Sequence, residues 1–204
     1  MIKNITDIIY CKAGNKITFE IPISNDRKVY MSVEKSNYCN DERCVVLVES
    51  NKLLELWRNE PYSIHREQSM GNPTTWSHDR KYGQAKIGFS LGIGNPVPLA
   101  DVTCGEATKN HPIYKRKFLL FKTLIGIEKE QIEYVAFTNG ITRTIWLLAN
   151  QAPFFPVECE VKNGSERLAS AGGLATKSHY TVEELFQLIP DGNEITNTFK
   201  SHKQ

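Results

Sequence analysis

Hydrophobic and polar residues alternate along the first fifty positions in the pattern of β-strands. The alternation is regular over Lys16–Ile23 and returns over Val29–Val33, while Cys44–Val48 is a continuous apolar run. Period-two alternation places apolar side chains on one face of a strand, and a short apolar run indicates a strand buried on both faces. Lys52–Arg58 then changes to helical spacing and predicts a short helix before Pro61. The chain therefore opens with a β-rich segment.

A long polar stretch follows, with no clear period. Residues 59–88 are rich in charged and turn-forming side chains, so we expect a loop there. Residues 88–99 contain three glycines and two prolines and predict a turn that leads into a strand. Phe118–Thr123 predicts another strand, and Gly126–Gln131 is expected to form the turn that follows it.

The clearest succession of elements surrounds Gly140. Tyr134–Phe137 is short, aromatic and apolar, as a buried strand is, and the Asn-Gly pair after it is a strong turn signal. From Ile141 the apolar spacing becomes helical until Pro153 ends the helix. Phe155–Cys159 predicts a further strand. The pattern is thus strand, glycine turn, helix and strand.

Two shorter helices are expected near the C-terminus. Ser165–Ala171 is rich in small residues and stops before two glycines. Thr181 and Glu184 have the capping-box spacing, which predicts an amphipathic helix that reaches Ile189. Residues 195–204 are expected to form a frayed tail.

The turn at Gly140 has the chemistry of an anion site. The first turn of a helix presents unpaired backbone N–H groups and the positive end of the helix dipole. Arg143 adds a permanent charge, Thr142 and Thr144 add hydroxyl donors, and Gly140 lets an anion approach the backbone. The same pattern also fits a plain β–α–β crossover, with Arg143 solvated or paired with a surface acid. Sequence alone leaves both interpretations open.

A second group of charges lies in residues 106–117, the most basic segment of the chain. Its cations are Lys109, Lys115, Arg116 and Lys117. They could contact the phosphate backbone of DNA, in which case binding would weaken steeply with salt. The alternative is a solvated loop whose charges contact only water.

Composition narrows the class of protein. The 204 residues carry a formal charge of +2 and are 40% hydrophobic, which suits a single domain with a proper core. A nearly neutral net charge argues against a protein whose general role is to coat nucleic acid. No run of 18 apolar residues occurs, and the N-terminus lacks the cleavage pattern of a signal peptide. We therefore expect a cytoplasmic protein without membrane insertion.

The five cysteines are expected to be reduced thiols, because an odd number without a secretory signal is typical of a reducing compartment. Cys39 and Cys44 have the spacing of half a zinc site. No matching pair of Cys or His residues follows, so no metal site is predicted.

Several of these motifs together resemble the plasmid fertility inhibition factors and, more widely, the ParB/sulfiredoxin superfamily. The resemblance lies within residues 89–161 and rests on three motifs: Val97-Pro98-Leu99, Asn139-Gly140-Ile141-Thr142-Arg143 and Phe155-Pro156-Val157. It implies an α+β fold, with a mixed β-sheet, a few helices and a ParB/sulfiredoxin-like core. In that arrangement residues 1–88 would be a β-rich N-terminal extension, and residues 162–204 would supply C-terminal helices and a tail of the same domain.

Three positions depart from the superfamily pattern. Ile141 stands where sulfiredoxins carry their reactive cysteine, which argues against reduction of sulfinic acids. Asn139 replaces the Asp of many members, and Thr142 replaces a frequent histidine. These replacements favour weak or lost catalysis.

The resemblance implies a protein made by one plasmid that blocks the conjugative transfer of another. Its expected partner is the conjugation coupling protein, an ATPase of the type IV secretion machinery at the inner membrane. The alternative partner is the complex of relaxase and DNA that passes through it. The chain would then reach the inner membrane through the coupling protein.

An enzyme is the competing function, because superfamily members bind nucleoside triphosphates and some cut DNA. The phosphates of ATP would be held by residues of the turn and of the loop beside it: Asn139, Gly140, Thr142, Arg143, Thr144, Asn95 and Pro98. As catalytic residues, Arg143 would stabilise charge on the transferred phosphoryl group and Glu106, with Mg²⁺, would hold the attacking water. Glu106 is chosen only because it is near the Val97-Pro98-Leu99 strand in sequence.

Overall fold

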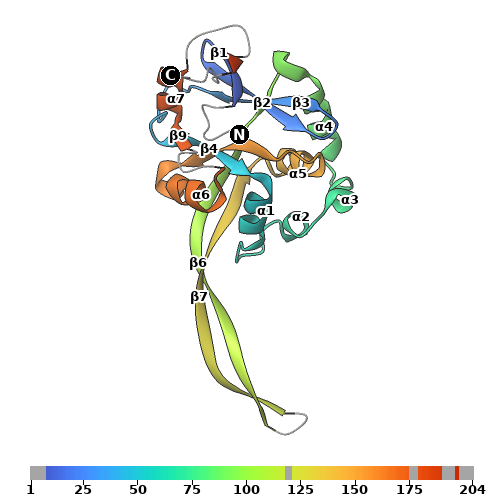
Figure 1. Cartoon of the computed structure of the whole chain (residues 1–204), viewed down its shortest axis with the longest axis vertical. Helices are drawn as coiled ribbons and strands as arrows, with labels where there is room; N and C mark the ends of the chain where they lie inside the picture. Colours follow the sequence, from blue (N-terminus) through green and yellow to red (C-terminus); the bar gives the residue numbers. More distant parts are fainter. Residues whose placement is uncertain (1–7, 118–120, 175–178, 190–195, 198–204) are drawn as a thin grey trace, which may run out of the picture.

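The computed structural model describes residues 8–117, 121–174, 179–189 and 196–197 and has the expected α+β architecture, with two mixed five-stranded sheets (Figure 1). The first sheet has the strand order β10-β1-β2-β3-β5. In that order its strands are Thr196–Asn197, Ile9–Ala13, Lys16–Ile23, Arg27–Glu34 and Val97–Pro98. Strands β1 to β3 form an antiparallel meander, whereas β5 runs parallel to β3. Strand β2 has the bounds that its alternating sequence predicts.

The second sheet contains the strands on both sides of the glycine turn and has the order β7-β6-β8-β4-β9. These strands are Phe121–Asn139, Ala100–Lys117, Phe154–Glu160, Arg43–Glu49 and His179–Thr181. Strand β6 is antiparallel to β7 and parallel to β8. The helix between β7 and β8 therefore connects two strands of opposite direction, so the parallel β–α–β crossover that the sequence left open as an alternative is not formed there.

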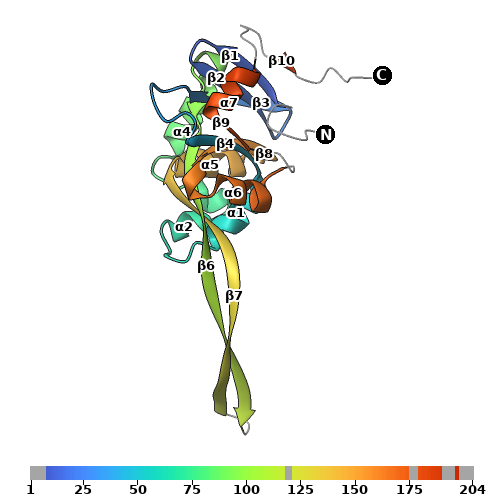
Figure 2. The ribbon, with the colours of Figure 1, turned by 90° about the vertical axis from the view of Figure 1, so that its left-hand side faces the viewer.

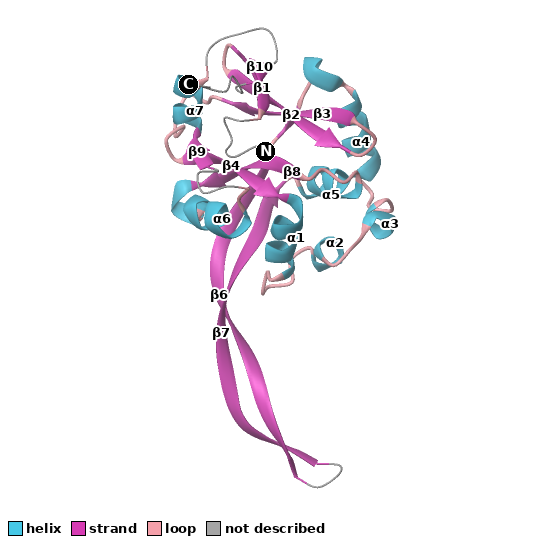
Figure 3. Ribbon diagram, viewed as in Figure 1, coloured by secondary structure: helices cyan, strands magenta, loops and turns pink. Residues whose placement is uncertain are grey.

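Helices pack on both sheets, most of them on the second (Figure 3). The α-helices are α1 (Ser50–Arg58), α2 (Arg66–Ser69), α3 (Pro73–Trp76), α4 (Tyr82–Ser90), α5 (Ile141–Ala149), α6 (Ser165–Gly172) and α7 (Val182–Leu188). Short 3-10 turns span Gly92–Gly94 and Val161–Asn163. The capping box predicted for α7 is confirmed, since Thr181 and Glu184 exchange both capping hydrogen bonds. Within the described parts of the chain, no helix has the length and apolarity needed to cross a membrane.

Strands β6 and β7 form a hairpin that is much longer than either sheet requires. They pair from Asp101↔Asn139 to Lys117↔Phe121, with register shifts between Asp101 and Val102 and between Ile113 and Tyr114. Only the first part of the hairpin lies in the sheet, and the rest projects away from the body as a two-stranded ribbon (Figures 1 and 2). The predicted strand over residues 118–123 lies partly outside the described residues. The turn expected at Gly126–Gln131 is wrong, because these residues lie inside β7.

The interior has one large apolar cluster and one small one. The large cluster joins both sheets and includes Phe19 and Met31 of the first sheet and Val46 and Phe155 of the second. The small cluster contains Trp57, Trp76 and Ile145, with Phe137 packed against it. It fixes helices α1, α3 and α5 to each other, and so it holds the start of α5 in place.

The polar stretch over residues 59–88 is more ordered than its sequence suggests. It contains α2, α3 and most of α4, so the expectation of a loop is corrected there. Asn72 caps α3 with a capping box that includes Thr75, and the buried Trp76 donates its Nε1–H to the carbonyl oxygen of Gln68 at 2.7 Å. Capping and one buried aromatic side chain order a segment without any long apolar period.

The divisions expected at residues 88 and 161 stay predictions. Strand β4 belongs to the proposed N-terminal extension and pairs with β8 of the proposed core. Strand β5 belongs to the proposed core and pairs with β3. Part of the predicted tail, Thr196–Asn197, forms the short edge strand β10 beside β1.

A candidate anion-binding cleft at the start of helix α5

The turn between β7 and α5 depends on glycine at position 140. Gly140 has φ of 91°, a left-handed conformation that side chains other than glycine rarely adopt. A Cβ atom there would lie 2.7 Å from the Cα and Cβ of Ala100 and 2.7 Å from Nε of Arg143. The space that glycine leaves is thus occupied by the neighbouring strand and by the arginine.

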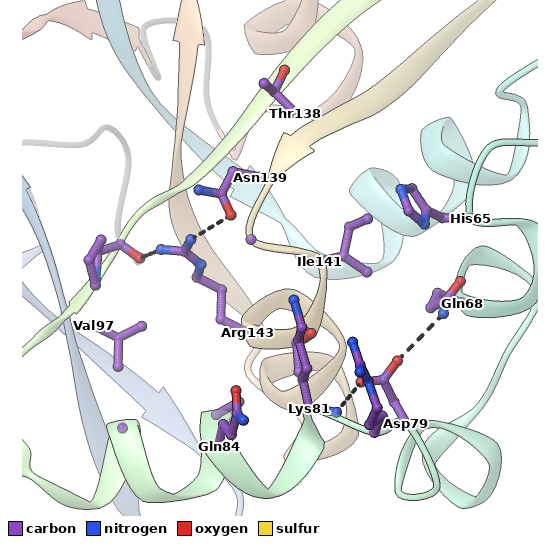
Figure 4. Close-up of a pocket in the computed structure, with 16 residues that line it drawn as sticks. His65, Gln68, Asp79, Lys81, Gln84, Val97, Thr138, Asn139, Ile141 and Arg143 are labelled. Atoms are coloured by element: carbon purple, nitrogen blue, oxygen red, sulfur yellow. Dashed lines mark hydrogen bonds between the residues drawn. The ribbon is translucent and has the colours of Figure 1, made fainter.

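Arg143 is held by three neighbours, of which Figure 4 shows Asn139 and Pro98. Its guanidinium donates to the carbonyl oxygens of Pro98 and Leu99, at 2.6 and 3.1 Å, and to Oδ1 of Asn139 at 3.2 Å. These bonds join the start of α5 to the Val97-Pro98-Leu99 strand, which is 45 residues away in sequence at Pro98. Arg143 therefore connects two of the sequence motifs, residues 139–143 and residues 97–99, and holds them together.

Electrostatics around Arg143 involve a carboxylate that the sequence did not indicate. Burial lowers the pKa of Arg143, and the charge of Asp101 opposes that shift. Burial also raises the pKa of Asp101, with the carboxylates of Glu158 and Glu160 adding to the effect. Asp101 begins the hairpin opposite Asn139. An acid is thus coupled to Arg143, but it is Asp101 rather than Glu106.

A cleft of about 670 Å³ lies beside this turn (Figure 4). One wall is formed by Thr138 to Arg143 and by Val97 and Pro98. The opposite wall is formed by residues of the polar segment 59–88: His65, Gln68, Asp79, Arg80, Lys81, Gln84, Ala85 and Gly88. The volume is in the range of small-ligand sites in proteins.

The cleft carries more positive than negative charge. Arg80, Lys81 and Arg143 line it, and Asp79 is the acidic residue among its lining residues. Asp79 accepts a hydrogen bond from the backbone N–H of Lys81 at 2.9 Å and from Gln68 Nε2 at 3.5 Å. Within the described chain neither Arg80 nor Lys81 has an ion pair. Cations without partners beside a helix start favour an anionic ligand.

The structure brings together part of the predicted nucleotide site. Asn139, Gly140, Thr142, Arg143 and Pro98 all line the cleft. Thr144 is fully buried, and its hydroxyl has no hydrogen-bond partner within the described chain, so it faces the interior.

Two further predicted residues lie elsewhere. Asn95 follows the 3-10 turn at Gly92–Gly94 and is not among the residues that line the cleft. Glu106 lies on β6 and forms an ion pair with Arg167 of α6 at 2.9 Å. It is not among the lining residues either. The catalytic roles of Glu106 and Arg143 stay predictions.

The four cations predicted to contact DNA lie along β6 rather than in a loop. Lys109 stands opposite Glu130 in the register of the hairpin. Lys115, Arg116 and Lys117 lie at the C-terminal end of the same strand, in the ribbon that projects from the body (Figure 2). The two predicted phosphate-binding sites are therefore separate places on the molecule.

Sequence reasoning did not assign Asp79, Arg80 and Lys81 to the site. Their place in the wall of the cleft depends on the packing of Trp76 against Trp57 and Ile145, which are distant in sequence. The signal available was a cluster of charges around a tryptophan in a polar segment.

The cysteines form no disulfide in the described structure. Burial raises the pKa of Cys104 to about 11 and that of Cys159 to about 12, so both stay protonated thiols at neutral pH. Among the described residues no group of three or more His, Cys, Asp or Glu side chains could hold a metal ion.

The fold and the cleft together define an α+β protein with two mixed sheets and a cationic cleft at a glycine turn. A family model described as "Plasmid Fertility inhibition factor" matches residues 45–173, more than half of the chain. The chain therefore belongs to the plasmid fertility inhibition factors. Every residue that lines the cleft falls within the matched range.

Individual relatives agree with this assignment. The chain is 26% identical to Protein osa of Shigella flexneri over 163 residues, which are 80% of this chain and 72% of that protein. It is also similar to the crystal structure of an Oncogenic Suppression Activity Protein, described as a plasmid fertility inhibition factor, in a gold(I) cyanide derivative. That match has a TM-score of 0.64 and 26% identity, and it covers 88% of this chain and 80% of the other.

Proposed function

We propose that this protein blocks the conjugative transfer of another plasmid by acting on the coupling protein of the transfer machinery, or on the relaxase–DNA complex delivered to it. The observation that carries the proposal is the family match over residues 45–173. Because that range includes the whole lining of the cleft, the cleft is a feature of the part of the chain that defines the family.

The cleft is the proposed site of a phosphate-bearing ligand. Its cations, its helix start and its volume of about 670 Å³ suit a nucleoside triphosphate. Arg80 and Lys81 are the residues best placed to bind phosphate, because the guanidinium of Arg143 already bonds to two carbonyl oxygens. Asp79 is the carboxylate in the cleft that could contact a Mg²⁺ ion bound with the phosphates, since Mg²⁺ commonly uses one or two carboxylates.

A conjugation assay tests the inhibitory function. Donor cells that carry a conjugative plasmid should transfer it less often when they also express this chain. Lys81→Gln should weaken the inhibition if the cleft is needed for it. Lys86→Gln is the matched control, because Lys86 belongs to α4 and also loses one charge, but it lines a different pocket, beside Trp146. Unchanged transfer with the wild-type chain expressed would refute inhibition of that plasmid.

The partner is tested by capturing proteins from donor cells with the tagged chain. The coupling protein should be recovered in the absence of DNA if it is the direct target. Recovery of the relaxase instead, and its loss on nuclease treatment, would identify the relaxase–DNA complex. Recovery of neither would refute both partners.

Nucleotide hydrolysis and DNA cleavage form the second candidate function, supported by the cationic lining of the cleft. Purified protein should bind ATP with Mg²⁺, and Lys81→Gln should bind it less tightly than Lys86→Gln. Hydrolysis or plasmid nicking that is lost in Arg143→Lys, with ATP binding retained, would assign chemistry to the arginine. Binding without turnover in the wild type would leave the cleft a ligand site only.

A further inference from the structure

The distal end of the β6–β7 hairpin carries exposed apolar side chains that nothing in the described structure covers. We call the following six residues the tip patch: Ile113, Tyr114, Phe121, Leu124, Ile125 and Ile127. Their side chains are between 44% and 70% exposed. They lie at the end of the ribbon that is farthest from both sheets (Figures 1 and 2). Contiguous exposed apolar side chains of this kind mark an interaction surface.

The charges of the same segment are all of one sign. Residues 112–127 contain four cations and no acidic residue. Of these cations, Lys115 and Lys122 are exposed and have no ion pair within the described chain. In the register Lys115 stands opposite Thr123 and Lys122 opposite Arg116, so no acidic residue is paired with either lysine. An anionic partner would supply the missing negative charge.

The part of the ribbon nearer the body has a different charge pattern. There His111 Nε2 lies 2.8 Å from Oε2 of Glu130, and Lys109 faces Glu130 in the register. Opposite charges across the strands compensate each other in this part. The uncompensated charge is therefore confined to the segment that also carries the tip patch.

Apolar residues occupy both faces of the ribbon at its distal end. Tyr114 pairs with Leu124, and Ile127 pairs with Pro112, which places these residues on one face. Ile113 and Lys115 alternate with Tyr114 and so belong to the opposite face. A groove on a protein would cover one face of a ribbon, whereas a lipid surface surrounds an inserted tip on all sides.

We propose that the tip patch, together with Lys115 and Lys122, docks this protein onto an anionic phospholipid surface. Apolar side chains would reach the acyl boundary while the lysines contact lipid phosphates, as in other interfacial segments. The outer N–H and C=O groups of a two-stranded ribbon are unpaired, so its backbone stays at the level of the headgroups. This binding is peripheral, because only side chains of the tip patch enter the lipid, and it requires no segment that spans the bilayer. It also does not depend on the proposed coupling-protein contact.

Sedimentation with vesicles tests the electrostatic part of the proposal. Wild-type protein should sediment with vesicles that contain phosphatidylglycerol and remain in solution with pure phosphatidylcholine. The double variant Lys115→Gln/Lys122→Gln should bind the anionic vesicles about 30-fold more weakly, which corresponds to about 2 kcal/mol for two cations. The control Lys109→Gln/Lys129→Gln removes the same charge from the same strands and should bind as the wild type does. Equal loss in both variants would overturn the proposal.

Fluorescence tests the depth of contact. Phe121→Trp places an indole at the tip, and Thr108→Trp places one on the exposed part of the ribbon nearer the body. Brominated acyl chains should quench the fluorescence of the Phe121→Trp variant and leave that of the Thr108→Trp variant unchanged. No quenching at either position would refute insertion of the tip patch.

Double-stranded DNA serves as the competing ligand in the same experiment. If the tip instead grips nucleic acid, Lys115→Gln/Lys122→Gln should lose DNA binding while no form of the protein sediments with anionic vesicles. That result would overturn the lipid proposal. Because only purified protein, lipid and DNA are used, failure here would not bear on the conjugation assay.

Discussion

The two ends of the β6–β7 hairpin are formed by the same two strands but differ in whether their side chains find partners within the chain. At the end within the body, Gly140 leaves space that Ala100 and Arg143 fill, and the guanidinium donates to the Val97-Pro98-Leu99 strand. At the distal end, apolar side chains such as Phe121 are exposed and lysines lack acids. The first end is therefore determined by contacts within the chain, whereas the second exposes apolar and cationic side chains that are available to another surface.

A matched pair of glycine substitutions gives the largest expected difference between the two ends. Gly140→Ala should destabilise the protein by about 3 kcal/mol, because it adds a Cβ at positive φ and 2.7 Å from Ala100. Gly126→Ala, in the distal part of β7, should change the free energy of unfolding by less than about 0.5 kcal/mol, since among the described residues only Ile113 lies as close as 4.0 Å to the new Cβ. Urea denaturation measures both. Equal effects would contradict the view that only the first end is fixed by close packing.

Arg143 gives the next largest effect. Arg143→Ala should cost about 2 kcal/mol of unfolding free energy, because the carbonyl oxygens of Pro98 and Leu99 lose a charged donor. Arg143→Lys keeps the charge but not the planar fork, and should recover only part of the loss. Thermal or urea unfolding measures the order of stability, which should be highest for the wild type, lower for Arg143→Lys and lowest for Arg143→Ala. An alanine variant as stable as the wild type would show that the arginine is free to serve a ligand alone.

Asp101 adds a pH dependence to the same end. Its folded pKa is raised, chiefly by burial, so the folded state binds the proton more tightly than the unfolded state does. The contribution to stability is therefore present below the ordinary Asp range and is lost as pH rises through the folded pKa. Asp101→Asn should be more stable than the wild type at neutral pH and lose that advantage in acid. Unfolding curves at several pH values measure this, and a variant advantage that grows in acid would contradict the sign.

The sequence predicted those parts of the molecule whose signals are local. Alternation identified β2, and the change of period at Gly140 identified the end of β7, the turn and α5. The long ribbon was missed because a two-stranded arm exposed on both faces shows no alternation, and its Pro112 and Gly126 resemble loop residues. What determines such a ribbon is cross-strand pairing, which no short window of sequence contains.

The residues of the candidate site also divide into those that the sequence could predict and those that it could not. Asn139 to Arg143 could be predicted because the turn and the helix start are contiguous in sequence. The wall with Asp79 and Lys81 could not, since its position depends on the packing of Trp76. Nearness in sequence was a poor guide to Glu106, which pairs with Arg167, whereas Asp101 is the acid coupled to Arg143.

Substitutions in the tip patch test the distal end directly and should have the smallest effect on stability. Leu124→Ser/Ile127→Ser should change the free energy of unfolding by less than about 0.5 kcal/mol, because both side chains are more than half exposed. Val135→Ala, which shortens a fully buried side chain of the same strand near the body, should cost about 2 kcal/mol. Binding to vesicles with phosphatidylglycerol should follow the reverse order: lost in the serine variant and retained in the alanine variant. A serine variant that is strongly destabilised would show that the tip patch serves the fold, and the contrast between the two ends of the hairpin would fail.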